Sequence, residues 1–201
     1  GNNMTNTDIC NMALSYLART RIKSLEENIE EAKECQMFYE PSRRLLLRSY
    51  SWGFANRLVR LAVLDTELPG FACVYKYPAG CLAVRLIYDT ETARRRIKEK
   101  HPFEVMMTEG AVTVITTDVK DAWAEYTADV TDTAQFSPEF SEALAHYLAS
   151  QMAMQLTGNA NIKMTEYQLF QAVLLRAKVE TASERHRELE WDTPYARARF
   201  S

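Results

Sequence analysis

The chain has 201 residues, of which 47% are hydrophobic and 25% are charged, and its formal net charge is −3 at pH 7. This composition is that of a globular protein with a sizeable core. The mildly negative charge excludes electrostatic binding of nucleic acid over the whole surface, but not over a local basic patch. No apolar run reaches the roughly 18 residues that span a bilayer, so we expect no transmembrane helix and no membrane partner. The four cysteines are too few and too scattered for a disulfide framework, which indicates a reducing compartment.

The N-terminal part of the chain is predicted to form two helices. Apolar residues recur at helical spacing from Ile9 to Leu17, after candidate N-cap residues at Thr5 and Thr7. The periodicity is then interrupted over residues 22–25, which predicts a loop.

The second helix is predicted to begin at Asn28. The Asn28 side chain is placed to cap the amides near Glu31, and Glu31 is placed to return the bond, as in a capping box. Pro41 lies inside the helical pattern and removes one backbone hydrogen bond, so we expect a kink or a break there.

The middle of the chain, from Arg57 to Val130, changes to the two-residue period of strands. Residues 82–88 alternate, and residues 103–107 and 112–116 flank Glu109-Gly110, a hairpin signal. A further strand is predicted within residues 123–130. Because short turns separate these strands, we expect an antiparallel sheet or a small barrel rather than a parallel sheet.

Helical pattern returns at Ser137-Pro138-Glu139, where a cap residue, a proline and an acid begin a helix. Gly158 predicts the end of this helix, and a fourth helix is predicted over residues 162–187, packed antiparallel to the third. The predicted fold is therefore α+β, with a four-helix body made of N- and C-terminal helix pairs and an inserted antiparallel β-sheet or small barrel. The predicted helical domain comprises residues 1–56 and 137–190. The predicted β domain is inserted at residues 57–136, and the predicted C-terminal tail comprises residues 191–201.

The sequence contains no recognisable catalytic motif. It has neither a glycine-rich phosphate loop nor a Gly-x-Ser-x-Gly elbow, and Cys73 and Cys81 are too far apart for a metal knuckle. We therefore expect no enzyme, no cofactor and no metal. The three histidines are interpreted as solvated, with His146 on the polar side of its helix; they are His101, His146 and His186. A Cys–His pair assembled in space is left open.

The strongest local charge feature is a basic segment made of Arg94, Arg95, Arg96, Lys98 and Lys100. Such a segment can contact phosphates or an acidic partner. The competing interpretation is a solvated connection between strands.

The C-terminal tail combines aromatic residues with arginines, which are the side chains that dominate interface energetics; these are Trp191, Tyr195, Arg197, Arg199 and Phe200. The tail is interpreted either as a segment that a partner orders or as a frayed terminus.

Several short motifs follow one another in a characteristic order. The residues that carry them are Ala32, Cys35, Tyr39, Trp52, Phe54 and Ala55, then Tyr77, Pro78 and Cys81, and finally Phe136, Pro138, Phe140, Ala143, Leu144, Tyr147 and Leu148. In this order they resemble the phage tail tubular protein A family. Two positions depart from the family pattern: Ala18-Arg19 stands where a Leu-Gly helix end is expected, and Pro41 lies within the second helix.

The resemblance implies a structural subunit of a head-to-tail adaptor in a short-tailed phage or prophage. Such subunits form a twelve-membered ring between the portal and the tail nozzle, lining the channel through which DNA passes without sequence-specific binding. The implied partners are further copies of the chain, the portal protein, the nozzle protein and the tail fibre. The implied locations are the virion tail and, during assembly, the host cytoplasm. The alternatives are another tail-completion or connector protein, and a DNA-binding accessory protein.

Overall fold

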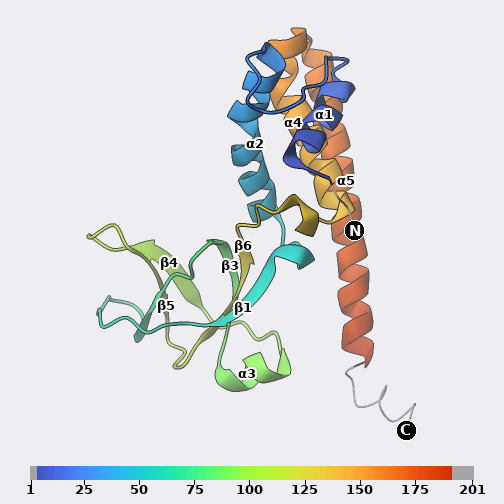
Figure 1. Ribbon diagram of the computed structural model, residues 1–201. Helices are drawn as coiled ribbons and strands as arrows, with labels where there is room; N and C mark the ends of the chain where they lie inside the picture. The colour runs from blue at the N-terminus through green and yellow to red at the C-terminus, as the bar shows by residue number, and fades with distance from the viewer. Residues whose placement is uncertain (1–3, 192–201) are drawn as a thin grey trace. The chain divides into compact units, whose positions relative to one another are not determined.

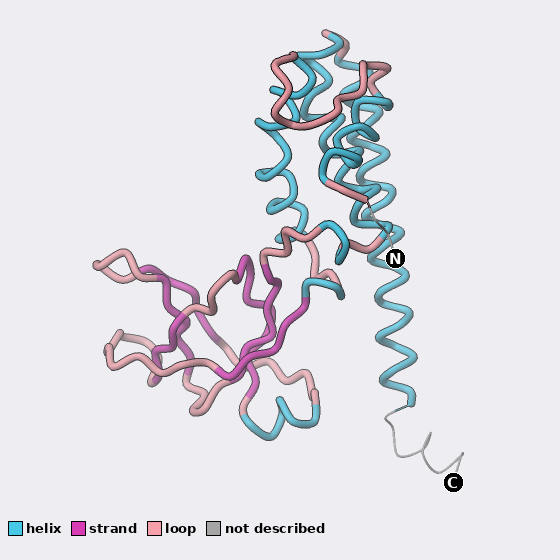
Figure 2. The backbone as a smooth tube through the Cα atoms, in the orientation of Figure 1, coloured by secondary structure: helices cyan, strands magenta, loops and turns pink. Residues whose placement is uncertain are grey.

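The computed structural model describes the backbone of residues 4–191 and the side chains of residues 4–181. The chain folds as two compact units (Figure 1). The helical unit contains the two ends of the chain, up to Leu46 and from Thr131, and the β unit spans Leu47–Val130. Figure 2 shows the four long helices in one unit and the strands in the other. The predicted α+β class is confirmed.

The helical unit is built around one central helix. Its helices are α1 (Asn6–Tyr16), α2 (Glu30–Ser49), α4 (Pro138–Thr157) and α5 (Ala160–Trp191). Helix α4 is the most buried helix of the unit, with twelve buried residues between Phe140 and Leu156, because α1, α2 and α5 all contact it. The exposed residues of this stretch, Met154 and Gln155, lie near its C-terminal end. An amphipathic helix has one apolar stripe, whereas a helix that is surrounded by others is buried around its circumference.

The predicted helix ends are confirmed where capping chemistry is local. The Thr5 side chain accepts a hydrogen bond from the Asp8 amide, and the Asp8 carboxylate accepts one from the Thr5 amide. The Ser137 hydroxyl caps α4, with Pro138 at its first position. Gly158 ends α4 in the left-handed conformation, at φ 64°.

Helix α2 differs from its prediction at its N-terminal end. It begins at Glu30 rather than at Asn28, and Glu31 accepts a bond from the Arg19 guanidinium at 2.9 Å. It also continues through Pro41 without a break. Pro41 has no N–H, so the Met37 carbonyl lacks its helical hydrogen-bond donor. Both residues are exposed, so water can solvate that carbonyl.

Helix α1 ends in a Schellman motif that lacks the usual glycine. The Arg19 amide donates to the Leu14 carbonyl at 2.9 Å, and the Ala18 amide donates to the Ser15 carbonyl at 3.1 Å. Ala18 takes the left-handed conformation, with φ 56°. This conformation usually selects glycine, and alanine adopts it here.

The β unit contains two three-stranded antiparallel sheets rather than a closed barrel. The first has the order β1 (Asn56–Arg60), β6 (Trp123–Ala128), β3 (Cys81–Tyr88), and the second has the order β2 (Cys73–Lys76), β5 (Thr113–Thr117), β4 (Phe103–Met107). Both sheets contribute to one core, in which Tyr75 and Ile115 of the second sheet pack with Ile87 and Ala124 of the first.

The predicted hairpin is present as β4 and β5, which pair antiparallel. Its turn places Ala111, rather than Gly110, at a positive φ of 61°. The alternation expected over residues 82–88 does not produce one buried and one exposed face, because β3 carries two register shifts and its first six residues are all half-buried.

The structure adds three short elements that the sequence did not predict. Helix α3 (Thr90–Arg95) follows β3, with Asp89 and Thr92 forming a capping box. Two 3-10 turns, η1 (Gly53–Ala55) and η2 (Thr133–Gln135), flank the strands.

Candidate functional site: exposed apolar surfaces

Helix α5 is apolar on two opposite sides. One side, with Phe170 and Ala177, is buried in the helical unit. On the other side, Met164, Leu175 and Val179 are 63%, 64% and 58% exposed. At about 100° per residue these three side chains lie within about 60° of one another around the helix. We call them the outer face of α5. A single exposed apolar residue is ordinary, but an aligned set on a helix indicates a surface that another element covers.

Methionine is unusually exposed in this protein. Five of the eight methionines have exposed side chains; these are Met37, Met106, Met107, Met154 and Met164. Methionine is usually buried, and its flexible, polarisable side chain is favoured on surfaces that adapt to a partner. The distribution therefore indicates contact surfaces on both units.

A second apolar surface lies on the β4–β5 hairpin. Val105, Met106, Met107 and Val112 are exposed, and we call them the hairpin patch. Strand β4 is an edge strand, paired with β5 along one side. Natural edge strands are commonly protected by charge or proline, and β4 carries a single charge, at Glu104. An apolar edge of this kind is suited to protein–protein contact.

The structure divides the predicted basic segment. Arg94 and Arg95 lie in α3 and pair with Glu91, at 3.2 Å and 3.4 Å. Lys98 and Lys100 are exposed in the connection that follows.

Arg96 is held differently from the rest of the basic segment. It has φ 55°, and its guanidinium donates to the buried carboxylate of Glu125 at 2.8 Å. Tyr88 contacts the same carboxylate oxygen at 3.5 Å. Arg96 is therefore paired with a buried acid of β6 although its side chain is 55% exposed, and the partner contact of the basic segment stays a prediction.

The predicted tail residues lie almost entirely outside the described part of the chain. Trp191 is the last residue of α5, and Tyr195, Arg197, Arg199 and Phe200 fall outside the described residues. The tail contact stays a prediction.

The family-motif residues of α2 point into the helical unit. Ala32, Cys35 and Tyr39 are buried, and the Cys35 thiol lies 3.7 Å from the Met152 sulfur of α4. The pKa of the Cys10 thiol is raised by its hydrogen bond with Cys35 and by burial, so Cys10 stays protonated.

The motif residues from Trp52 to Cys81 lie in the β unit. Trp52 and Ala55 are buried, and Phe54 beside them is half-buried. Tyr77, Pro78 and Cys81 form the turn into β3, where the Cys81 amide donates to the Pro78 carbonyl at 3.2 Å. Burial raises the pKa of Tyr77 and of Cys81, which are hydrogen-bonded to each other.

The prediction of a solvated His146 is wrong. Its ring nitrogen Nδ1 lies 2.6 Å from the Glu166 carboxylate, and both residues are buried, at 8% and 6% exposure. The ring stacks on Tyr16 with centroids 4.3 Å apart. Burial, followed by the charges of Glu142 and Glu166, raises the pKa of Tyr16. His146 is not on a solvated side of α4, because Tyr16 of α1 and Glu166 of α5 cover that side. His146 is thus committed to an acid, and Cys10 to another thiol, so these two do not form a Cys–His pair.

His101 is half-buried rather than solvated, and the side chain of His186 lies outside the described residues. One set of side chains in the described part of the chain has the spacing of metal ligands, namely Asp89, Glu99 and His101.

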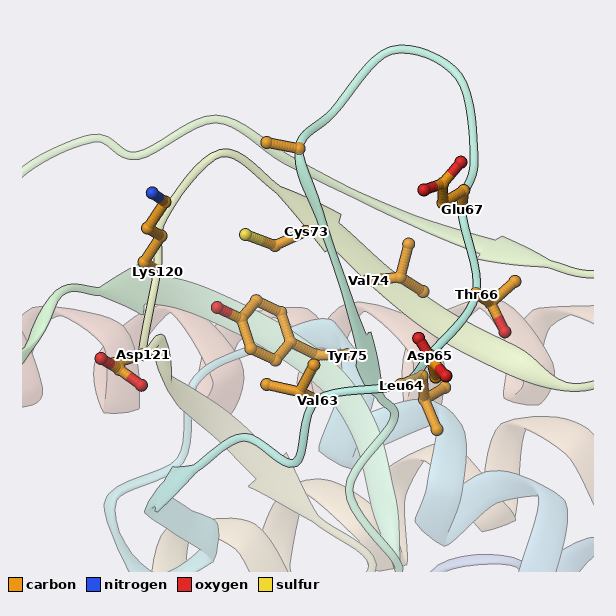
Figure 3. A pocket seen from close by; sticks show the side chains of 11 residues that line it. Val63, Leu64, Asp65, Thr66, Glu67, Cys73, Val74, Tyr75, Lys120 and Asp121 are labelled. Carbon is orange, nitrogen blue, oxygen red and sulfur yellow. The ribbon is translucent and has the colours of Figure 1, made fainter.

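An open pocket of about 380 Å³ lies in the β unit (Figure 3). Lys120 and Asp121 line one side and the loop over residues 63–67 lines the other, with the Tyr75 ring between them. The Tyr75 hydroxyl donates a hydrogen bond to the Val119 carbonyl. This bond holds the turn between β5 and β6, so Tyr75 is a structural member of the pocket wall.

In the described part of the chain, no helix is both long enough and apolar enough to cross a membrane. Comparison of the chain with models of known protein families finds no match, and comparison with curated protein sequences finds none either.

Proposed function

We propose that this protein is a structural subunit of an adaptor ring that joins the portal to the tail nozzle of a short-tailed phage and lines the DNA channel. The observation that carries the proposal is the outer face of α5, together with the ordered motifs that resemble the tail tubular protein A family. A set of exposed apolar side chains on the side of α5 opposite its buried residues is accounted for if a neighbouring subunit covers it.

Ring formation requires two different complementary surfaces on each subunit, because a head-to-tail interface joins one face to another. The protein offers two such surfaces on separate units, the outer face of α5 and the hairpin patch. The hairpin patch also presents an edge strand, which can add backbone hydrogen bonds to apolar contacts.

The charge distribution supports a channel wall better than a DNA reader. The net charge is −3, and Arg94 and Arg95 share their charge with Glu91. A reader of base sequence presents unpaired cations on an element that fits a groove, and α3 has only six residues. A channel wall that attracts the DNA phosphates only weakly allows the DNA to slide past it.

The test is electron microscopy of the purified protein, alone and mixed with its cognate portal ring. We expect a closed ring stacked coaxially on the portal. Binding to a different tail component, with no binding to the portal, would favour the alternative of another connector or tail-completion protein. No ring and no binding to any tail component would refute the proposal.

The contribution of the α5 outer face is tested by Leu175→Glu. Burying the exposed part of a leucine is worth about 1–2 kcal/mol, and a buried unpaired carboxylate costs more, so ring formation should weaken by at least about 10-fold. The matched control is Leu169→Glu on the same helix, because Leu169 is also exposed but lies about 120° away around the axis. We expect rings from the control but not from Leu175→Glu. Equal assembly of both variants would exclude the outer face as the interface.

A further inference from the structure

Three side chains of the β unit form a cluster that the proposed function does not use. These are Asp89, Glu99 and His101, and one ligand atom from each lies within 4.8 Å of the other two. Asp89 precedes α3, whereas Glu99 and His101 lie in the connection from α3 to β4. The cluster therefore joins the two ends of the segment that contains α3.

Asp89 has one carboxylate oxygen occupied by a structural task. Its Oδ1 accepts bonds from the Thr92 amide at 2.7 Å and from the Thr92 hydroxyl at 2.8 Å, which caps α3. These capping bonds all use Oδ1, so Oδ2 can coordinate an ion while the cap stays intact. The capping bonds also fix the orientation of the carboxylate, as the hydrogen bonds around a metal ligand do.

His101 supplies the decisive geometry. Its Nε2 atom is buried and makes no hydrogen bond within the described structure. The nearest acid oxygen, Glu99 Oε2, lies 3.6 Å away. This separation is longer than the roughly 3.2 Å limit of an N–H···O bond. It is close to the roughly 3.4 Å that separates two ligand atoms of a tetrahedral ion with bonds of about 2.1 Å. A buried, unpartnered nitrogen at that spacing from a carboxylate points to a cation between them.

We propose that Asp89, Glu99 and His101 form a zinc site with three protein ligands and water as the fourth. Imidazole and carboxylate are both ligands of Zn²⁺, whereas Mg²⁺ and Ca²⁺ prefer oxygen ligands alone. Two carboxylates balance the charge of a divalent ion. The ion ties the connection between α3 and β4 to the start of α3, which closes the loop that carries the basic segment.

The competing explanation is a simple ion pair between a protonated His101 and the two acids. That explanation requires no ion, and it predicts that Zn²⁺ has no effect on the protein. Isothermal titration of the chelator-treated full chain with ZnCl₂ separates the two explanations. We expect one ion bound per chain, with little binding of MgCl₂ under the same conditions.

Near-isosteric variants test whether the ion binds at this cluster. Asp89→Asn keeps an oxygen that can cap α3 and removes the charge, and Glu99→Gln removes the other carboxylate. The matched control is Glu91→Gln, which makes the same charge change on α3 outside the cluster. We expect Zn²⁺ binding to weaken by more than about 10-fold in Asp89→Asn, Glu99→Gln and His101→Ala, and to be unchanged in Glu91→Gln. Circular dichroism of each variant without metal checks that the fold is retained.

Cobalt substitution gives a readout that does not depend on affinity. Co²⁺ bound at this cluster should show visible d–d absorption without a thiolate charge-transfer band. A thiolate band would place the ion at Cys73 or Cys81 instead and would overturn the proposal. Absence of Zn²⁺ binding by the wild-type chain, or equal binding by the three cluster variants, would overturn it as well. None of these measurements depends on ring assembly, so the zinc site and the adaptor function can fail independently.

Discussion

Replacing Ala18 by glycine tests whether the end of α1 stores backbone strain. Ala18 occupies the left-handed position of a Schellman motif, with φ 56°. In this conformation the Cβ atom approaches the following carbonyl, which costs a non-glycine residue roughly 1–2 kcal/mol. Ala18 is exposed, so removing its methyl group takes away no core contact.

The gain is partly offset in the unfolded state. Glycine loses about 0.5–1 kcal/mol more conformational freedom on folding than alanine does. The net expectation is that Ala18→Gly stabilises the protein by about 0.5–1 kcal/mol. For a chain of this size, this corresponds to a rise in Tm of roughly 1–4 °C.

The assay is urea unfolding followed by circular dichroism at a helix wavelength, because Ala18 lies in the helical unit. The matched control is Ser15→Gly, three residues earlier and also exposed. Ser15 has ordinary helical geometry, so glycine should destabilise the protein there by about 0.5 kcal/mol. The two glycine variants are therefore expected to shift the unfolding midpoint in opposite directions. A destabilisation by Ala18→Gly as large as that by Ser15→Gly would refute the strain at Ala18.

Two further substitutions probe buried polar groups. Tyr39→Phe removes a buried hydroxyl that has no hydrogen-bond partner among the described residues, so it should be neutral or stabilising by up to about 1 kcal/mol at pH 7 in urea unfolding. Burial raises the pKa of Tyr39, so only the unfolded chain loses this proton once the pH exceeds the ordinary tyrosine value of about 10, and the stability of the wild type falls as the pH rises from there towards the folded-state value. The variant should therefore lose less stability than the wild type between pH 9 and about 11, and equal losses would contradict this assignment. Arg96→Ala leaves the Glu125 carboxylate buried without its cation and should cost about 2–3 kcal/mol, less than a fully buried pair because Arg96 is half-exposed. A double-mutant cycle with Glu125→Gln measures the coupling, and a coupling energy near zero would show that the pair is not stabilising.

The helix ends and the hairpin could be predicted from the sequence because the interactions that form them are local. Thr5 and Ser137 cap amides three residues away, and Gly158 reaches the left-handed conformation without steric cost. The hairpin of β4 and β5 closes within a few residues for the same reason. The four-helix arrangement and the antiparallel strands follow from short connections and from the change in hydrophobic period.

The candidate surfaces were only partly visible in the sequence. The basic segment was identified from the sequence, but not that Arg96 pairs with a different acid from Arg94 and Arg95. Its partner, Glu125, lies 29 positions away along the chain. The outer face of α5 was missed because Met164, Leu175 and Val179 fall into a helical pattern that also contains the buried residues of the same helix. Only exposure in the folded chain separates the two sets.

The sequence by itself determined the capped start of α1, both ends of α4, which segment forms strands, and the order of the motifs that resemble a known family. Each of these rests on neighbours within a turn or a hairpin. The tertiary structure alone decided that α1 and α5 cover His146, which is buried against Glu166, and that the strands form two sheets rather than one. It also decided that Asp89, Glu99 and His101 meet. These outcomes depend on contacts between segments that are distant in the sequence. Because several alternative pairings of such segments have comparable free energies, local sequence patterns do not specify which pairing forms.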